Sequence, residues 1–347
     1  MNHVSGIRTI AIAATVVLAV ACQSACLTGG DRKPGLFTLM SYNVMTLFDA
    51  TDDGVEYDGF SVARGEWDET RYRARVEAMA SAVRGTLAGG PDVLVVQEIE
   101  NRDVLADLSE ALGGYPVVLF PDSGDSPISV GILSRFPCVA ARAHVPAGPD
   151  GAGSRVMLEA ELDVSGRRFV VLAAHWKSKL GGDAETEPER ARAAALAGAV
   201  IRARLHDDPG LAVALAGDLN ESPDEYERAG KAYTTALMPA SAGDGPWLRV
   251  SFERAGAGFD GGGMVMFCPW DEAGGYSYLH DGEEERIDNI LASPGTVGGG
   301  PLRLVAFSAE PAEFLVDESG APRPWNARTG SGWSDHLPVV ATFAPTP

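Results

Sequence analysis

The chain has little of several features that define common protein classes. Its 347 residues include four cysteines, and aromatic residues make up 7% of them. So few cysteines exclude a small disulfide-stabilised scaffold and leave a hydrophobic core as the main source of stability. There is no internal repeat, and no second long apolar run follows the one near the N-terminus. With 45% hydrophobic residues, the chain can bury a large core, in one big domain or two ordinary ones.

Positive charge is also scarce. The chain has 28 Lys+Arg against 48 Asp+Glu, which gives a net charge of -20 at pH 7. This balance argues against broad, sequence-independent affinity for polyanions. It does not exclude a polyanionic substrate, because a bound divalent cation and a local group of Arg and Lys can reverse the field within a cleft.

The N-terminal segment has the pattern of an export signal. Arg8 precedes an apolar run over residues 10–21 that is too short to span a bilayer comfortably. Leu18-Ala19-Val20-Ala21-Cys22 resembles a bacterial lipoprotein signal, in which Cys22 becomes the lipidated first residue. We therefore predict a signal peptide over 1–21, a flexible tether over 22–35, and a membrane-anchored lipoprotein at the cell surface or in the periplasm. The alternative is an ordinary secretion signal cut nearby, which would release a secreted protein.

Two further cysteines, Cys138 and Cys268, are far apart in the sequence. In an oxidising compartment they could form a disulfide, but two isolated cysteines do not establish one. Either is equally consistent with a small buried hydrophobic residue.

Apolar runs and their periodicity predict alternating strands and helices from residue 36 onward, with no domain break. Strands are expected at 36–44, 92–98, 117–120, 129–134, 155–164, 168–174, 211–216, 285–292 and 337–343. Helices are expected at 70–87, 101–112 and 188–206. Residues 221–275, rich in Gly and Pro, are expected to form a short helix and long loops. Arg71, Arg73 and Arg75 are assigned to the solvated face of the first helix.

Eight polar residues share one position, in or at the end of a predicted strand. They are Asn43, Glu98, His175, Asp218, Asn220, Asp288, Asp335 and His336. Reactive groups gather at strand ends in layered α/β folds, because the rigid scaffold meets open solvent there. For Asp218 and Asn220, which follow the run 211–216 at alternate positions, a simple turn is the alternative. Together these residues predict an oxygen-rich site for a hard cation such as Mg2+, with imidazoles to handle protons.

Seven short motifs contain these residues. They are Ser-Tyr-Asn-Val (41–44), Asp-Val-Leu-Val-Val-Gln-Glu (92–98), Gly-Ile-Leu-Ser-Arg-Phe-Pro (131–137), His-Trp-Lys-Ser-Lys (175–179), Gly-Asp-Leu-Asn (217–220), Arg-Ile-Asp-Asn-Ile-Leu (286–291) and Ser-Asp-His-Leu-Pro-Val (334–339). Their order resembles the endonuclease/exonuclease/phosphatase superfamily, which includes deoxyribonuclease I and the exonuclease III-type repair nucleases. The resemblance implies a fold of the α/β class over 36–347, a four-layered α-β-β-α sandwich of two mainly antiparallel sheets flanked by helices.

The resemblance also implies which residues bind the metal and the substrate. Glu98 and Asp335 would be metal ligands with Asn43 beside them, and Mg2+ is the expected ion, with Mn2+ or Ca2+ as alternatives. The phosphate contacts we expect near the motifs are Arg135, Arg155, Lys177 and Lys179.

The remaining residues are assigned to catalysis by the same resemblance. His336, oriented by Asp288, would contact the scissile phosphate or activate the water, and it shares the assignment as general base with Asp218. His175 would bind phosphate and stabilise its developing charge, and Asn220 would position the water or the phosphate. In-line attack of water builds negative charge on the phosphoryl oxygens, which a metal and imidazole donors can stabilise.

One departure from the family narrows the function. Exonuclease III-type members often carry a phosphate-binding tyrosine just before the strand at 131–134, and residues 125–129 have none, which argues against abasic-site repair. The sequence predicts an exported, monomeric, metal-dependent phosphodiesterase that acts on nucleic acid as a nuclease. The alternative is a phosphatase or a sphingomyelinase- or inositol-phosphate-type phosphoesterase. A surface binding protein without catalysis is the third, and the intact acids and histidines argue against it.

Overall fold

The apolar strands assemble into two large sheets. The computed structural model describes residues 35–121, 126–146, 155–260, 263–309 and 311–346, and its first sheet has six strands in the order β16-β17-β1-β2-β4-β3. The bounds are β1 Phe37–Leu47, β2 Val93–Ile99, β3 Val117–Leu119, β4 Ser129–Ser134, β16 Leu302–Ser308 and β17 Val339–Pro345. β1 and β2 are parallel, whereas β2 and β4 are antiparallel.

The second sheet has nine strands in the order β5-β6-β7-β8-β15-β12-β10-β9, with β11 paired to β12. The bounds are β5 Cys138–His144, β6 Met157–Val164, β7 Arg167–His175, β8 Ala212–Asp218, β9 Leu237–Pro239, β10 Leu248–Ser251, β11 Gly258–Asp260, β12 Gly263–Phe267 and β15 Asp288–Ala292. A separate hairpin consists of β13 Tyr278–His280 and β14 Glu283–Glu285.

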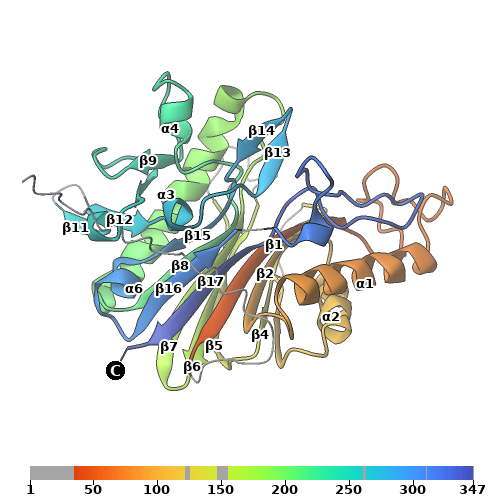
Figure 1. Ribbon diagram of the computed structural model, residues 1–347, viewed down its shortest axis with the longest axis horizontal. Helices are drawn as coiled ribbons and strands as arrows, with labels where there is room; N and C mark the ends of the chain where they lie inside the picture. Colours follow the sequence, from red (N-terminus) through yellow and green to blue (C-terminus); the bar gives the residue numbers. More distant parts are fainter. Residues whose placement is uncertain (1–34, 122–125, 147–154, 261–262, 310, 347) are drawn as a thin grey trace, which may run out of the picture.

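Helices cover the outer face of each sheet (Figure 1). The helices are α1 Glu69–Thr86, α2 Arg102–Ala111, α3 Asp183–Asp207, α4 Glu225–Arg228, α5 Trp270–Ala273 and α6 Pro294–Gly298, with short 3-10 turns at Arg254–Gly256 and Glu313–Leu315. The core of α1 and α2 packs on the first sheet, and the apolar residues of α3 pack on the second. This arrangement confirms the predicted four-layered α-β-β-α sandwich.

Side-chain alternation lets β1 contribute to two cores. Phe37 and Leu39 pack between the sheets, whereas Met40 and Tyr42 pack against the helices. Because the side-chain period of a strand is two, Asn43 belongs to the same series as Phe37 and Leu39. β1 therefore carries a polar group to the edge of the space between the sheets.

Some predicted elements differ from the observed ones. α3 begins at Asp183 and runs through Pro188, where the prediction started because proline favours the first turn of a helix. Residues 221–275 form β9, β10, β11 and β12, which are too short for periodicity to reveal. The sequence analysis also did not predict β5 and β16, and β5 is a mostly exposed edge strand with few large apolar residues.

The structure also bears on the two isolated cysteines. Cys138 and Cys268 are both free thiols in the structure, and Cys268 is buried as a small hydrophobic residue. The expected signal peptide and Cys22 lie outside the described residues. Within the part of the chain that the structure describes, no helix is long and apolar enough to cross a membrane.

Candidate active site

Strand register brings three of the predicted residues side by side. His175 ends β7 and pairs with Asp218 at the end of β8, and Asp288 at the start of β15 pairs with Asp218 on its other side. The preceding residue, Gly217, has a φ of +151°, and a Cβ there would lie 1.8 Å from the carbonyl oxygen of Ala174. Only glycine allows β7 and β8 to approach this closely, and this approach sets the row of side chains.

Asn43 joins this row to the first sheet. Its side chain is fully buried, and Nδ2 donates hydrogen bonds to Asp218 Oδ2 at 3.0 Å and to Glu98 Oε1 at 3.2 Å. The predicted residues of β1, β2 and β8 therefore form one cluster across the two sheets, as the sequence analysis expected of strand ends.

Glu98 reaches the cluster through a local break in β2. The register of β2 shifts between Gln97 and Ile99, and Glu98 has a φ of +68°. Such bulges redirect a side chain, and non-glycine residues in this conformation carry strain of about 1–3 kcal/mol. Glu98 Oε2 accepts a hydrogen bond from Thr46 Oγ1 at 2.8 Å, so both carboxylate oxygens have a donor.

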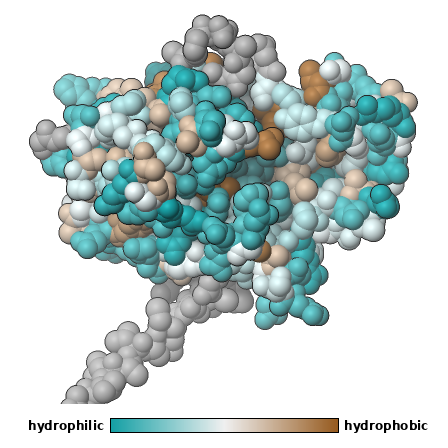
Figure 2. Space-filling view, turned by 90° about the horizontal axis from the view of Figure 1, so that it is seen from above, coloured by the Kyte–Doolittle hydropathy of each residue, from teal (hydrophilic) through white to brown (hydrophobic). Residues whose placement is uncertain are grey.

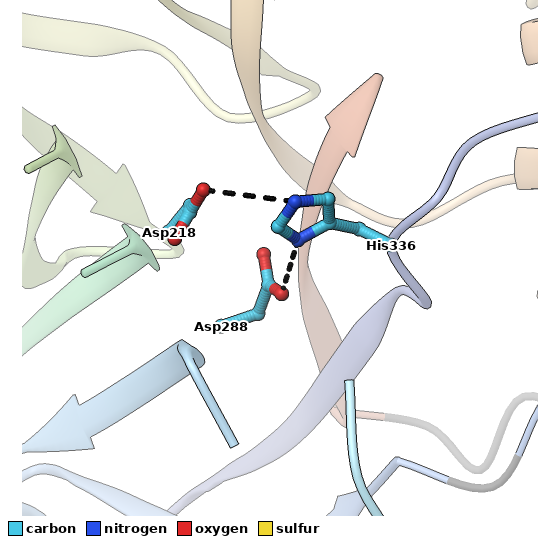
Figure 3. A group of neighbouring side chains, drawn as sticks. All are labelled: Asp218, Asp288 and His336. Carbon is cyan, nitrogen blue, oxygen red and sulfur yellow. Dashed lines mark hydrogen bonds and ion pairs between the residues drawn. The ribbon is translucent and has the colours of Figure 1, made fainter. Parts of the chain in front are cut away.

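His336 lies between two carboxylates of the second sheet (Figure 3). Its Nδ1 is 2.8 Å from Asp288 Oδ2, and its Nε2 is 3.9 Å from Asp218 Oδ2. Ser334 holds the segment in place, because its hydroxyl donates to the carbonyl of Asn43 at 2.7 Å and accepts from the backbone N–H of His336. Ser334 belongs to the motif at 334–339, but the sequence alone did not indicate this role.

The two acid–base candidates both have raised pKa values, for different reasons. Burial alone would lower the pKa of His336, but the carboxylates of Asp288 and Asp218 outweigh it and hold this pKa well above its usual value. Burial raises the pKa of Asp218 to about 7, with the charge of Asp288 adding to the effect and that of His336 opposing it. An imidazolium donor thus sits beside a carboxylate that can accept a proton near neutral pH.

His175 is buried and differs from His336 in charge. Its Nε2 is 3.4 Å from Asp218 Oδ2 and 3.9 Å from Glu98 Oε1. Burial lowers its pKa well below the usual value, with Arg155 and His336 contributing in the same direction. His175 is therefore neutral at pH 7 and can donate one hydrogen bond, and its Nδ1 has no partner among the described residues.

Oxygen donors suited to a divalent cation are present at the cluster. Glu98 is 19% exposed at its side chain, and Asp335 is half-buried next to His336. Asn43 Oδ1 accepts from the N–H of Met45 at 2.9 Å, which uses one of its two lone pairs. Within the described residues, close groups of metal-binding side chains occur twice: Asp218 with Asp288 and His336, and Asp53 with Glu56 and Glu100.

The predicted phosphate contacts are not all brought to the cluster. Arg135 follows β4 at the other end of the sheet, where Ser134 pairs with Val93 rather than with Glu98. Its guanidinium donates to the carbonyls of Gly89 and Pro91, so Arg135 does not reach the cluster.

Lys179 and Arg155, two other predicted phosphate contacts, are both engaged by neighbouring groups. Lys179 Nζ is 2.8 Å from Glu225 and 3.5 Å from Glu285, which neutralise its charge locally. Arg155 donates to the carbonyl of Trp176 and acts electrostatically on His175, so it lies beside the cluster. Asn220 donates from Nδ2 to the same carbonyl at 3.1 Å.

Lys177 is half-buried, and its carbonyl accepts a hydrogen bond from Arg190 Nη1 at 3.3 Å. No ion pair is present at Lys177 among the residues that the structure describes. It remains, with Arg155, a candidate cation for phosphate. The upper face, seen in Figure 2, is largely hydrophilic with scattered hydrophobic residues.

Arg75 is a residue of this region whose role the sequence analysis missed. Its guanidinium is fully buried and donates to the carbonyls of Val44, Met45 and Trp333. The ring of Trp325 lies 5.1 Å from it. Burial lowers the pKa of Arg75 to about 10, which leaves it charged at neutral pH.

Arg75 ties together two distant segments of the site. One follows Asn43 and the other precedes Asp335. The prediction of a solvated face is wrong for Arg75, although Arg73 is exposed. The sequence spacing could have indicated this burial, because Arg75 lies three residues after Tyr72, on the buried face of α1.

The chain belongs to the endonuclease/exonuclease/phosphatase family, because the model of that family matches residues 38–236, more than half of the chain. No curated protein sequence matches it. Truncated TDP2 from Caenorhabditis elegans is 19% identical with a TM-score of 0.55, and the match covers 89% of this chain and 97% of that one. A family protein from Bacteroides thetaiotaomicron is 17% identical with a TM-score of 0.53, covering 91% and 100%. TDP2 from D. rerio is 17% identical with a TM-score of 0.51, covering 89% and 98%. At these identities the solved structures share the fold.

We expect Arg75→Gln to lower the free energy of unfolding by roughly 3–5 kcal/mol, because it leaves buried carbonyls without donors. Arg73→Gln, on the exposed face of the same helix, removes only surface pairs with Glu69 and Asp107 and should cost at most about 1 kcal/mol. Urea unfolding of both variants measures the difference. Equal losses would contradict a special role for Arg75.

Proposed function

We propose that the protein is an exported, Mg2+-dependent phosphodiesterase that hydrolyses nucleic acid by in-line attack of water. Membership of the family makes it a phosphoesterase-type hydrolase by fold. The observation that supports catalysis most directly is the cluster in which Asn43 joins Glu98 to Asp218, with His336 held against Asp288.

The side chains supply the proton chemistry of this reaction. Asp218, whose pKa is about 7, accepts a proton from the attacking water. His336 donates a hydrogen bond to a phosphoryl oxygen, and Asp288 orients its ring and stabilises its charge. His175 adds a neutral donor, and Asn220 Oδ1 is left to orient the water because Nδ2 is engaged.

Glu98 and Asp335 would hold the metal, and their oxygen donors fit Mg2+, with Mn2+ or Ca2+ as alternatives. When bound, the cation would supply positive charge against the phosphoryl oxygens. Asn43 has a positioning role in this scheme, because its amide holds the Glu98 carboxylate.

Nucleic acid is the substrate class that we favour. One solved structure with this fold, TDP2 from D. rerio, is described as complexed with a single-strand DNA product. The hydrophilic upper face supports the same class, and so does Lys177, which forms no ion pair with any described residue. Export and anchoring through a lipid on Cys22 follow from the pattern of residues 8–22.

Glu98→Gln or Asp335→Asn should lower kcat/KM by at least about 100-fold, as loss of a charge-stabilising group does in other hydrolases. The wild-type enzyme should need added divalent metal. Glu110→Gln, an exposed change on α2, is the control and should keep full activity. Undiminished turnover in excess chelator would rule out the metal.

Lys177→Glu should weaken hydrolysis of nucleic acid about 10-fold at ~0.1 M salt. It should also reduce the slope of log affinity against log salt concentration by about one, because each phosphate contact releases a counterion. A small diester such as bis(4-nitrophenyl) phosphate should be affected much less. Arg167→Glu, at the other end of β7, is the control. A nucleic acid that is never cut, while a lipid or inositol phosphate is, would reject the nuclease proposal.

We expect Cys22 to be lipidated, with residues 23–35 as the tether to the membrane. The basis is the short apolar run that ends in Ala21-Cys22. Mass spectrometry of the mature N-terminus, with Cys22→Ala as the control, measures this. An unmodified N-terminus elsewhere in the chain would disprove it.

A further inference from the structure

The hairpin β13–β14 is fastened to the segment that carries His336. Tyr278 forms an isolated antiparallel bridge with His336, and the N–H of Leu337 donates to the carbonyl of Ser277 at 2.7 Å. The hydroxyl of Ser277 accepts from the N–H of Asp288 at 3.0 Å. Figure 1 shows the hairpin at the top of the molecule, above β15. Tyr278 is thus fixed relative to both His336 and Asp288.

The ring of Tyr278 lies against the imidazole of His336. The ring centroids are 4.7 Å apart at an interplanar angle of 32°, and the centroid of the Tyr278 ring is also 6.3 Å from that of the exposed His280. Tyr278 is half-buried, and its hydroxyl makes no hydrogen bond to any residue that the structure describes. The hydroxyl is not buried, so it is open to water and to a ligand.

Donors for a phosphate are few at this site. Asn43 Nδ2 is occupied by two carboxylates, and Lys179 is paired with Glu225 and Glu285. His336 Nδ1 is bonded to Asp288. A donor beside His336 that is not already engaged would therefore add to the few groups available to a bound phosphate.

We infer that Tyr278 contacts the substrate, with its hydroxyl donating a hydrogen bond to an oxygen of the phosphate group held at His336. This inference rests on the proposed phosphodiesterase function and adds a residue to it. Burial raises the pKa of Tyr278, and the charges of Asp335 and Asp218 act in the same direction. The hydroxyl accordingly keeps its proton at neutral pH and remains a donor.

Tyr278→Phe isolates the hydroxyl, because it keeps the ring against His336. It should lower kcat/KM for bis(4-nitrophenyl) phosphate by about 10- to 100-fold, the range for a hydrogen bond to a charged group. The affinity for orthophosphate in the presence of Mg2+, measured by calorimetry, should fall by at least about 5-fold on the same basis. Tyr276→Phe is the matched control, since its hydroxyl donates to the carbonyl of Gly320 instead, and it should leave both quantities unchanged.

Three results would overturn the inference. The first is a Tyr278→Phe variant that binds orthophosphate and turns over the diester like the wild type, even if Tyr278→Ala is impaired, because the ring alone would then matter. The second is equal weakening by Tyr276→Phe. The third is a wild-type protein that does not bind orthophosphate. A wild type that binds orthophosphate but cuts no nucleic acid would reject the proposed substrate, and the calorimetric comparison would still decide the role of Tyr278.

Discussion

The amide of Asn43 is the interaction on which the arrangement of the site depends. It is fully buried between the sheets and donates to one carboxylate from each, Glu98 and Asp218. Two carboxylates so close together repel each other, and a shared donor offsets part of that cost. The bond also sets the position of the first sheet's edge against the second. Ser334 and Arg75 extend the same junction, because they bind the carbonyls of Asn43 itself and of the residues that follow it.

The sequence predicted the strand ends well because short apolar runs are local signals. β8 was recognisable from six consecutive residues, and Asp218 followed directly from its end. Such runs do not show which end of the sandwich a strand end occupies. Arg135 also follows a strand, but β4 is antiparallel to β2. Arg135 therefore lies at the end of the sheet that is remote from Glu98. The pairing of Lys179 was not predictable for a related reason. Its partners Glu225 and Glu285 come from distant parts of the chain.

Most of the cations near the site are used to hold the protein together. Arg75 binds backbone carbonyls, Arg190 lies between Glu187 and Glu221 with no exposed surface, and Lys179 is paired. In a chain with a net charge of -20, this leaves little free positive charge for a phosphate. Buried ion pairs of this kind add little net stability, because the cost of desolvation offsets their attraction. We therefore propose that substrate binding draws on a metal, on imidazoles and on neutral donors in addition to Lys177 and Arg155.

The same scarcity gives the raised pKa values of Asp218 and His336 their significance. Both side chains are buried, and burial by itself favours the neutral form of each. Two carboxylates share the imidazole of His336, so the proton is held on His336. The pKa of Asp218 is raised to about 7, so this carboxylate is close to protonation at neutral pH. Groups whose environments separate their pKa values in this way are suited to act as a donor and an acceptor at one pH. The residues that create this separation, Asp288 on β15 and Asn43 on β1, lie on different sheets. The acid–base pair is therefore a property of the closed sandwich and not of either sheet alone.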